Sequence, residues 1–241
     1  MNFLKKILEI IFPSHCLFCS KIVSKKSLFC EICWPKLQFI NEPKCTICGY
    51  PFEFQGLNLL CAKCLIKKPS FDKAISIFRY NHVLRSVIGN LKYRDQTFLA
   101  QKFAPFLLEK IKNEIENLPI IVAVPLHKKR LQKRKFNQAV LLAKSLQKLA
   151  PQLTFFSNFL IRTKNTKPQT TLRKKQRENN LKNVFALNKK YLNQVRGKNF
   201  LIIDDVTTTG ATLENCAKIL KKHGAKRITA LTIAKTAIFT N

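Results

Sequence analysis

The sequence predicts an α/β protein: a parallel sheet with helices on both faces, preceded by a small cysteine-rich module. Two observations predict this class. After Pro69, apolar runs of strand length alternate with amphipathic helical segments, and the runs are nearly continuous, as expected for strands covered on both faces. Before Pro69 lie eight of the nine cysteines. We therefore expect an N-terminal helix and a metal-binding module over residues 1–70 and the sheet domain over residues 71–241.

The second part of the chain alternates strand and helix. Residues 199–206 form a buried strand in this prediction, and residues 211–224 form an amphipathic helix that ends at Gly224, where a C-cap glycine belongs. Residues 164–183 are polar and basic without a hydrophobic period, which predicts a loop. In chain order, we predict strands at 74–80, 120–126, 155–163, 199–206 and 227–234, and helices at 82–92, 97–117, 137–149 and 211–224. Ligands of such sheets bind at the carboxyl ends of the strands.

The clustered cysteines form four C-x-x-C pairs in two tandem units, residues 16–33 and 45–64. One C-x-x-C turn points two thiolates at an ion, and a second turn after a short hairpin completes a tetrahedral shell. A thioredoxin-like site needs one pair, and disulfides need an oxidising compartment. We therefore predict a double zinc ribbon, with sequential and cross-braced pairing both open. The predicted ligands are Cys16, Cys19, Cys30, Cys33, Cys45, Cys48, Cys61 and Cys64.

The N-terminal stretch MNFLKKILEIIFP imitates a secretory signal, because Lys5 and Lys6 precede an apolar run. Glu9 interrupts that run, and no small-residue cleavage site follows. We expect a short amphipathic helix packed on the body, with weak contact to a membrane surface as the alternative. No apolar run approaches the roughly 20 residues of a transmembrane helix. The sequence therefore predicts a cytoplasmic protein.

The charge of the chain is strongly positive and unevenly distributed. Lys and Arg number 44 against 13 Asp and Glu, a formal net charge of +31. Residues 126–200 hold 20 Lys and Arg and a single acid, Glu178. Such a field attracts polyanions, which include nucleic acid, phosphorylated small molecules and acidic lipid. A proteome rich in Lys and Asn is the alternative explanation, but it does not account for the concentration in one segment.

Two adjacent acids, Asp204 and Asp205, end the predicted strand 199–206, and the loop 207–212 then opens a helix. Backbone N–H groups at a helix N-terminus favour an anion, and Gly210 lets the backbone approach a phosphate closely. The threonine hydroxyls of the loop add donors. The carboxylates can accept hydrogen bonds from two neighbouring hydroxyls, so the arrangement suits a ribose 5-phosphate. Helix capping alone would explain one aspartate and not two.

The stretch LIIDDVTTTGATL resembles the phosphoribosyl diphosphate (PRPP) binding motif of type I phosphoribosyltransferases. Other segments resemble the ComF competence-protein family: LKY (91–93), VPLHKKRLQKRKFNQA (124–139) and QTTLRKKQRENNLKNVF (169–185). In the last segment the matching residues are Gln169, Leu172, Arg177, Asn180 and Phe185. With the double zinc ribbon, the resemblance covers nearly the whole chain and implies a type I phosphoribosyltransferase-like fold. Lys135 departs from it, because the family usually has glycine before FNQ.

The resemblance implies roles for residues at this edge of the sheet. Asp204 and Asp205 are the candidate catalytic residues, and the basic segment after strand 120–126 is placed to bind diphosphate with Mg²⁺. Arg130 and Arg134 are the first candidates there, because a guanidinium binds phosphate in two places. The candidate PRPP-binding residues are Thr207, Thr208, Thr209, Gly210, Ala211, Thr212, Arg130 and Arg134.

Other residues near this edge fit two roles each. Lys128, Lys129 and Lys135 suit either diphosphate or a solvated basic face. His127 either contacts diphosphate or is a helix cap or packing residue. The loop 164–183 resembles the flexible hood that closes over the site in phosphoribosyltransferases. Its Arg173 and Arg177 can reach phosphate or single-stranded DNA.

Two functions follow from the resemblance. In the first, the protein is ComF-like: it binds PRPP and single-stranded DNA and serves DNA uptake in natural transformation, with a helicase-like partner. In the second, it is an active phosphoribosyltransferase with an unidentified acceptor and no role with DNA. The sequence shows no pocket for an acceptor base, so whether the protein is an enzyme stays open at this stage.

Overall fold

The chain is described here from a computed structural model. The structure describes residues 13–24, 27–54, 56, 59–115, 119–164 and 184–236. The helix predicted in the N-terminal stretch and nearly all of the predicted loop 164–183 lie outside these residues. Among the described residues, no helix combines the length and the apolar character that crossing a membrane requires.

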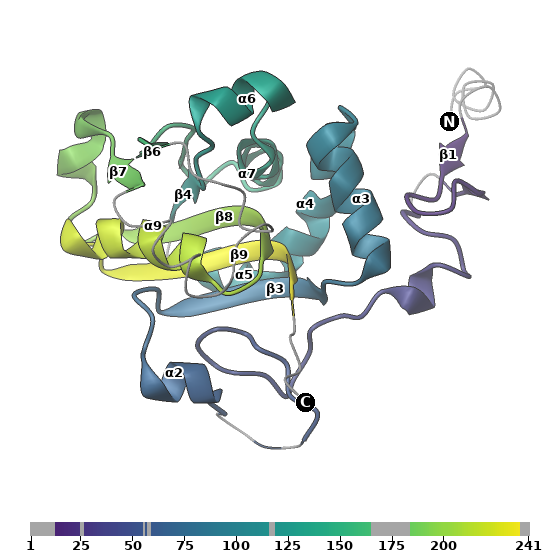
Figure 1. The fold of residues 1–241 in the computed structure, drawn as a ribbon, viewed down its shortest axis with the longest axis horizontal. Helices are drawn as coiled ribbons and strands as arrows, with labels where there is room; N and C mark the ends of the chain where they lie inside the picture. Colours follow the sequence, from purple (N-terminus) through teal and green to yellow (C-terminus); the bar gives the residue numbers. More distant parts are fainter. Residues whose placement is uncertain are drawn as a thin grey trace.

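A five-stranded parallel sheet forms the centre of the molecule (Figure 1). Every strand pair in it is parallel, as predicted, and Ile121 of one strand stands opposite Leu201 of the next. In spatial order the strands are β3 (Lys73–Arg79), β9 (Arg227–Lys235), β8 (Asn199–Thr207), β4 (Ile120–Ala123) and β5 (Phe155–Phe156). The order places β8, which ends in the two aspartates, in the middle of the sheet.

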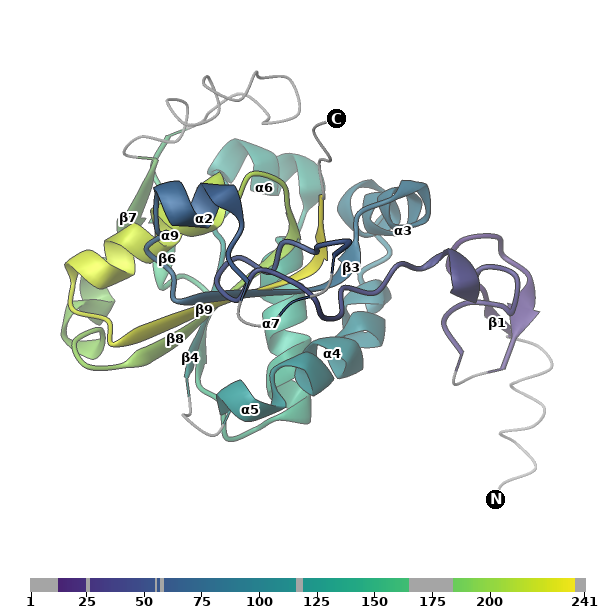
Figure 2. The ribbon, with the colours of Figure 1, turned by 90° about the horizontal axis from the view of Figure 1, so that it is seen from below.

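Helices cover both faces of this sheet. Figure 2 shows α4 (Phe98–Lys110) and α7 (Gln138–Leu149) on one face and α9 (Ala211–Lys222) on the other. Helix α3 (His82–Tyr93) follows β3 directly, and its N-cap Asn81 accepts a hydrogen bond from the Leu84 N–H at 3.1 Å. This side-chain cap fixes where α3 begins.

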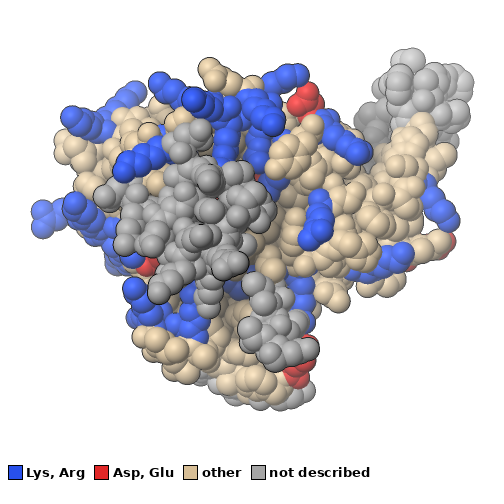
Figure 3. All heavy atoms as spheres, in the orientation of Figure 1, with Lys and Arg blue, Asp and Glu red and all other residues tan. Residues whose placement is uncertain are grey.

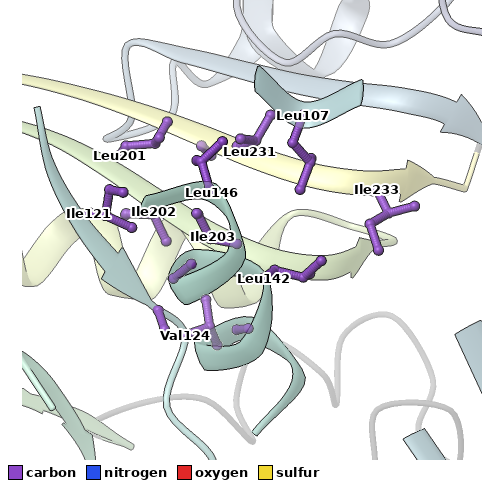
Figure 4. Packing of buried hydrophobic residues seen from close by; sticks show 14 of the residues in the cluster. Leu107, Ile121, Val124, Leu142, Leu146, Leu201, Ile202, Ile203, Leu231 and Ile233 are labelled. Atoms are coloured by element: carbon purple, nitrogen blue, oxygen red, sulfur yellow. The ribbon is translucent and has the colours of Figure 1, made fainter. Parts of the chain in front are cut away.

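The core lies between the sheet and its helices. Figure 4 shows Leu142 and Leu146 of α7 packed against strand residues that include Ile121 and Ile203. These four side chains have no exposed surface. Because both faces of the sheet are buried, its strands need apolar residues at successive positions, which is the pattern that predicted them.

One predicted strand, 155–163, is wrong as a single element. β5 joins the central sheet, whereas β6 (Leu160–Arg162) pairs antiparallel with β7 (Phe185–Leu187) in a separate sheet. Ser157 and Asn158 form a turn between β5 and β6, and such residues favour turns because their side chains compete with backbone hydrogen bonds. The sequence analysis predicted neither β7 nor the 3-10 helix η3 (Lys189–Gln194).

Other boundaries also differ from the prediction. The helix predicted at 97–117 divides at Ile111 into α4 and α5 (Lys112–Ile115). The strand predicted at 120–126 ends at Ala123, ahead of Pro125, which has no N–H to donate. Helix α6 (Lys128–Arg134) was not predicted, and it buries no residue. A helix without an apolar face leaves no hydrophobic period in the sequence.

The cysteine-rich module contacts the sheet domain at two separate places (Figure 1). Its first unit, with β1 (Ser14–His15), β2 (Ile22–Val23) and η1 (Trp34–Lys36), lies beside α3, where the Phe18 and His82 rings are 5.8 Å apart. Its second unit, with α2 (Ala62–Ile66), lies against β3. Between the units, Phe39 forms an antiparallel bridge with Phe78. That bridge covers the free edge of β3.

Candidate functional site

The eight paired cysteines form two compact clusters, and the pairing is sequential instead of cross-braced. Within each cluster the four Sγ atoms lie within 4.8 Å of one another. Cys19 and Cys30 Sγ are 3.5 Å apart, and Cys48 and Cys61 Sγ are 3.6 Å apart. A tetrahedral Zn²⁺ with Zn–S bonds of about 2.3 Å requires S–S edges of about 3.8 Å, so the geometry fits zinc. The sets are Cys16, Cys19, Cys30 and Cys33, and Cys45, Cys48, Cys61 and Cys64.

Asp204 and Asp205 lie near the carboxyl end of β8, as predicted, but their surroundings differ. Asp205 is buried, and its Oδ1 lies 2.9 Å from Nζ of Lys92 on α3. Asp204 is partly exposed, and its Oδ1 accepts the Asp205 N–H at 2.9 Å. The sequence analysis treated the two acids as equivalent acceptors for sugar hydroxyls. The structure instead ties one of them to a lysine and leaves the other at the surface of the site.

Charge and burial shift the pKa values of this group. Although part of Asp204 stays accessible, protein atoms surround its carboxyl group, and this partial burial raises its pKa to about 7; the neighbouring Asp205 adds to the rise, while Lys92 and Arg162 act in the opposite direction. Burial alone would lower the pKa of Lys92, but Asp205 holds it above its ordinary value. Asp204 therefore changes its protonation near neutral pH, whereas Lys92 stays charged.

The loop after β8 has the conformation that a helix N-terminal anion site requires. Gly210 is the N-cap of α9 with φ +79°, and a Cβ built there would meet no atom within 4 Å. The backbone therefore needs glycine for its conformation, and the space beside it is open. Thr207 is buried, and its carbonyl accepts the Thr236 N–H at 2.9 Å. The more exposed part of the loop is Thr208, Thr209, Gly210, Ala211 and Thr212.

Arg130 and Arg134 lie on α6, which begins just beyond the carboxyl end of β4. Both are partly buried. Arg134 Nη2 donates to Tyr93 Oη at 3.0 Å, its guanidinium carbon lies 4.9 Å from the Tyr93 ring centroid, and Nη1 donates to Gln138 Oε1 at 3.3 Å. Burial and the charge of Arg134 lower the pKa of Arg130. By contrast, the exposed lysines of this segment are Lys128, Lys129, Lys133 and Lys135.

Sequence reasoning missed two cations at this site. Lys92 comes from α3, and Arg162 comes from β6. Arg162 has its guanidinium carbon 5.4 Å from the Phe185 ring centroid, and burial together with the Arg130 charge lowers its pKa to about 10. The LKY resemblance was a signal for Lys92. Arg162 had no comparable signal, because it stood inside the strand predicted at 155–163.

Two ambiguous residues have structural roles here. His127 Nδ1 accepts the Lys129 N–H at 3.3 Å and caps α6, which is the capping role that the sequence analysis left open. Lys135 has φ +64°, in the left-handed region that favours glycine. Its Nζ lies 3.1 Å from Asp95 Oδ2. Arg173 and Arg177, by contrast, lie outside the described residues.

Comparison with known proteins gives matches in both parts of the chain. The double zinc ribbon domain model matches residues 7–65, and the phosphoribosyl transferase domain model matches residues 138–238. The predicted zinc ribbon and phosphoribosyltransferase-like fold are thereby confirmed, and the two four-cysteine clusters are the metal sites of the ribbon.

Three curated relatives align over most of this chain. Competence protein F of Haemophilus influenzae is 29% identical over 230 residues, which are 93% of this chain and 98% of the relative. DNA utilization protein YhgH of Salmonella typhi is 32% identical over 199 residues, 80% of this chain and 84% of the relative. Competence protein ComFC of Bacillus subtilis is 28% identical over 241 residues, 92% of this chain and 95% of the relative.

Proposed function

The chain belongs to the ComF family of competence-related proteins, and from this membership we propose that it serves DNA uptake by binding PRPP at the sheet edge and single-stranded DNA on its basic surface. One observation carries the PRPP proposal. A hydroxyl-rich helix N-terminus, an acid pair and three arginines lie around the carboxyl ends of neighbouring strands. Each part suits a different part of PRPP.

The 5-phosphate fits the loop 208–212, because the positive end of the α9 dipole and the threonine hydroxyls favour an anion there. The ribose hydroxyls fit Asp204, the more exposed acid of the pair. The diphosphate fits Arg130 and Arg134 on α6, since guanidinium groups bind phosphate oxygens in pairs. Tyr93 already orients the guanidinium of Arg134 before a ligand arrives.

Mg²⁺ suits this site because it takes oxygen ligands and usually bridges one or two carboxylates and substrate phosphates. Asp204 is the carboxylate placed to hold it. Bound there, the ion would neutralise diphosphate charge. Lys92 keeps Asp205 in place beside it.

Calorimetry with PRPP and Mg²⁺ tests the ligand proposal. We expect the wild type to bind, and Asp204→Asn to weaken binding by about tenfold or more, as expected for loss of a charged hydrogen-bond partner. Glu109→Gln is the matched control, because Glu109 is an exposed acid on α4 whose carboxylate pairs with Lys112. Equal heats for the wild type and Asp204→Asn would contradict the proposal.

The exposed lysines of α6 support the DNA proposal. Figure 3 shows Lys and Arg side chains gathered over α6 on this face of the molecule. Lys128, Lys129 and Lys133 of α6 are exposed. Because they are exposed, their ammonium groups are suited to contact phosphates along a DNA strand.

A salt titration of single-stranded DNA binding tests this role. Replacing Lys128, Lys129 and Lys133 with glutamine removes three charges and should reduce the slope of log affinity against log salt by about 2. The matched control replaces Lys189, Lys190 and Lys198, which are also exposed but lie elsewhere. If the two triple variants reduced the slope equally, or if the wild-type affinity did not depend on salt, the proposal that α6 contacts DNA phosphates would be refuted.

Phosphoribosyl transfer is the second candidate function, and one observation favours it. The pKa of Asp204, raised to about 7, allows its carboxyl group to exchange a proton near neutral pH. Release of diphosphate from PRPP in the presence of nucleobases measures this activity. Binding of PRPP without diphosphate release with any acceptor tested would favour the ligand-binding role over transfer.

A further inference from the structure

The second cysteine-rich unit, residues 45–64, contacts the loop 207–212, which is called the phosphate loop below. Lys63, which stands between the zinc ligands Cys61 and Cys64, donates from Nζ to the main-chain oxygen of Thr209. A second contact lies one turn along α9, where the N–H and Oγ of Ser70 donate to the Glu214 carboxylate at 2.7 and 2.9 Å. The zinc unit is therefore in contact with the loop and with the helix that follows it.

The unit is held against the sheet through the backbone. Gly49 has φ +66°, and a Cβ built there would lie 2.6 Å from the Ala74 carbonyl oxygen. The Ala74 N–H donates to the Ile47 carbonyl at 2.6 Å. No larger residue fits at Gly49 without displacing this contact. Because zinc fixes Cys61 and Cys64, and these contacts fix the knuckle on β3, Lys63 has a defined place beside the loop.

The phosphate loop has no positively charged side chain of its own, and Lys63 supplies one. Residues 207–212 carry no charged side chain, and the charged residue in the first turn of α9 is an acid, Glu214. The loop can offer an anion only N–H groups and hydroxyls of its own, so any cation beside a bound anion comes from another element. Lys63 supplies that charge at the backbone of Thr209.

We propose that Lys63 is a binding residue of the phosphate loop, held there by the second zinc centre, and that it pairs with the 5-phosphate of the ligand. This inference rests on the proposed function of the loop. In the ligand-free protein the ammonium group donates to Thr209, and a phosphate bound at the loop lies within reach of the same group. The second zinc unit then contributes a residue to the ligand site and also stabilises the fold of the cysteine-rich module.

Two probes separate the ends of the ligand: ribose 5-phosphate for the loop and inorganic diphosphate for the α6 arginines. Lys63→Met should weaken ribose 5-phosphate binding about tenfold, the effect of one charge-assisted hydrogen bond, and leave diphosphate binding unchanged. Lys63→Arg should retain most of the affinity. The matched control is Lys67→Met, which removes one charge from an exposed lysine one turn further on and should change neither affinity. Zinc content of every variant is measured and should equal that of the wild type.

The outcomes distinguish the inference from the proposed function. If the wild type binds ribose 5-phosphate and Lys63→Met binds it equally well, the inference is overturned while the proposed function stands. Equal weakening by Lys63→Met and Lys67→Met also overturns it, because the effect is then one of overall charge. If the wild type binds neither PRPP nor ribose 5-phosphate, the proposed function fails and the inference fails with it.

Discussion

Lys92 Nζ lies 2.9 Å from Asp205 Oδ1, and this ion pair joins α3 to the carboxyl end of β8. The lysine side chain is 21% exposed and the aspartate side chain 10%, so water screens the pair only weakly. The pair fixes the second acid of the site before any ligand binds. Asp204, one residue earlier, is left as the acid that a ligand can reach.

Lys92→Met should therefore destabilise the protein by about 2 kcal/mol, because it leaves Asp205 buried without its partner. Urea denaturation measures the free energy of unfolding. Lys144→Met is the control: Lys144 is exposed on α7, and its replacement should change stability by no more than about 0.5 kcal/mol. Equal stability of the two variants would show that the ion pair contributes nothing.

The raised pKa of Asp204 predicts a pH dependence of stability. Its folded-state pKa of about 7 exceeds its unfolded value, so between about pH 4 and 7 the folded protein binds the extra proton. Stability from this group consequently falls as pH rises through that window and is constant above it. Relative to Asp204→Asn, the wild type should lose up to about 3 kcal/mol between pH 4.5 and 8, since each pH unit inside the window is worth about 1.4 kcal/mol.

Denaturation of both proteins across this range measures the difference, since the other titrating groups are common to both and cancel. A difference that does not change with pH would mean that Asp204 has an ordinary pKa in the folded state. A difference that changes in the opposite direction would mean that its pKa is lowered.

The positions of the two acids and of the loop 207–212 could be predicted because local sequence determines them. A continuous apolar run specifies β8, and Gly210 must follow at the turn into α9. Lys92 and Arg162 could not be placed in the same way, because α3 and β6 meet β8 only in the folded chain. Tertiary contacts of this kind leave no periodic trace in the sequence.

In the zinc module, too, local features could be predicted from the sequence and tertiary contacts could not. The C-x-x-C spacing predicted the ligands, and it left two pairings open because both use the same cysteines. Nor did spacing indicate that Lys63 would meet Thr209, a residue 146 positions away in sequence. Gly49, directly after Cys48, has φ +66°, a conformation that favours glycine at such a turn.

Removal of zinc should loosen the cysteine-rich module while the central sheet stays folded. Apart from cysteines, the apolar residues that the described part of the module buries are Leu28, Phe29, Leu37 and Ile40, so metal binding supplies much of its folding energy. By contrast, β8 and β9 are held by buried side chains on both faces. Hydrogen exchange before and after chelation measures this. Protection should fall around α2 and persist in β8. Loss of protection throughout β8 and β9 would mean that the sheet domain depends on the metal.

Lys135 provides a last prediction, on stability. Its φ of +64° is unfavourable for a residue with a Cβ, by about 1 kcal/mol relative to glycine. The ion pair with Asp95 offsets little, since both side chains are more than half exposed. Lys135→Gly should therefore be at least as stable as the wild type, and about 1 kcal/mol more stable than Lys135→Ala, which loses the ion pair and keeps the strain. Urea denaturation of the three proteins measures these differences, and a less stable glycine variant would mean that the Asp95 contact outweighs the backbone strain.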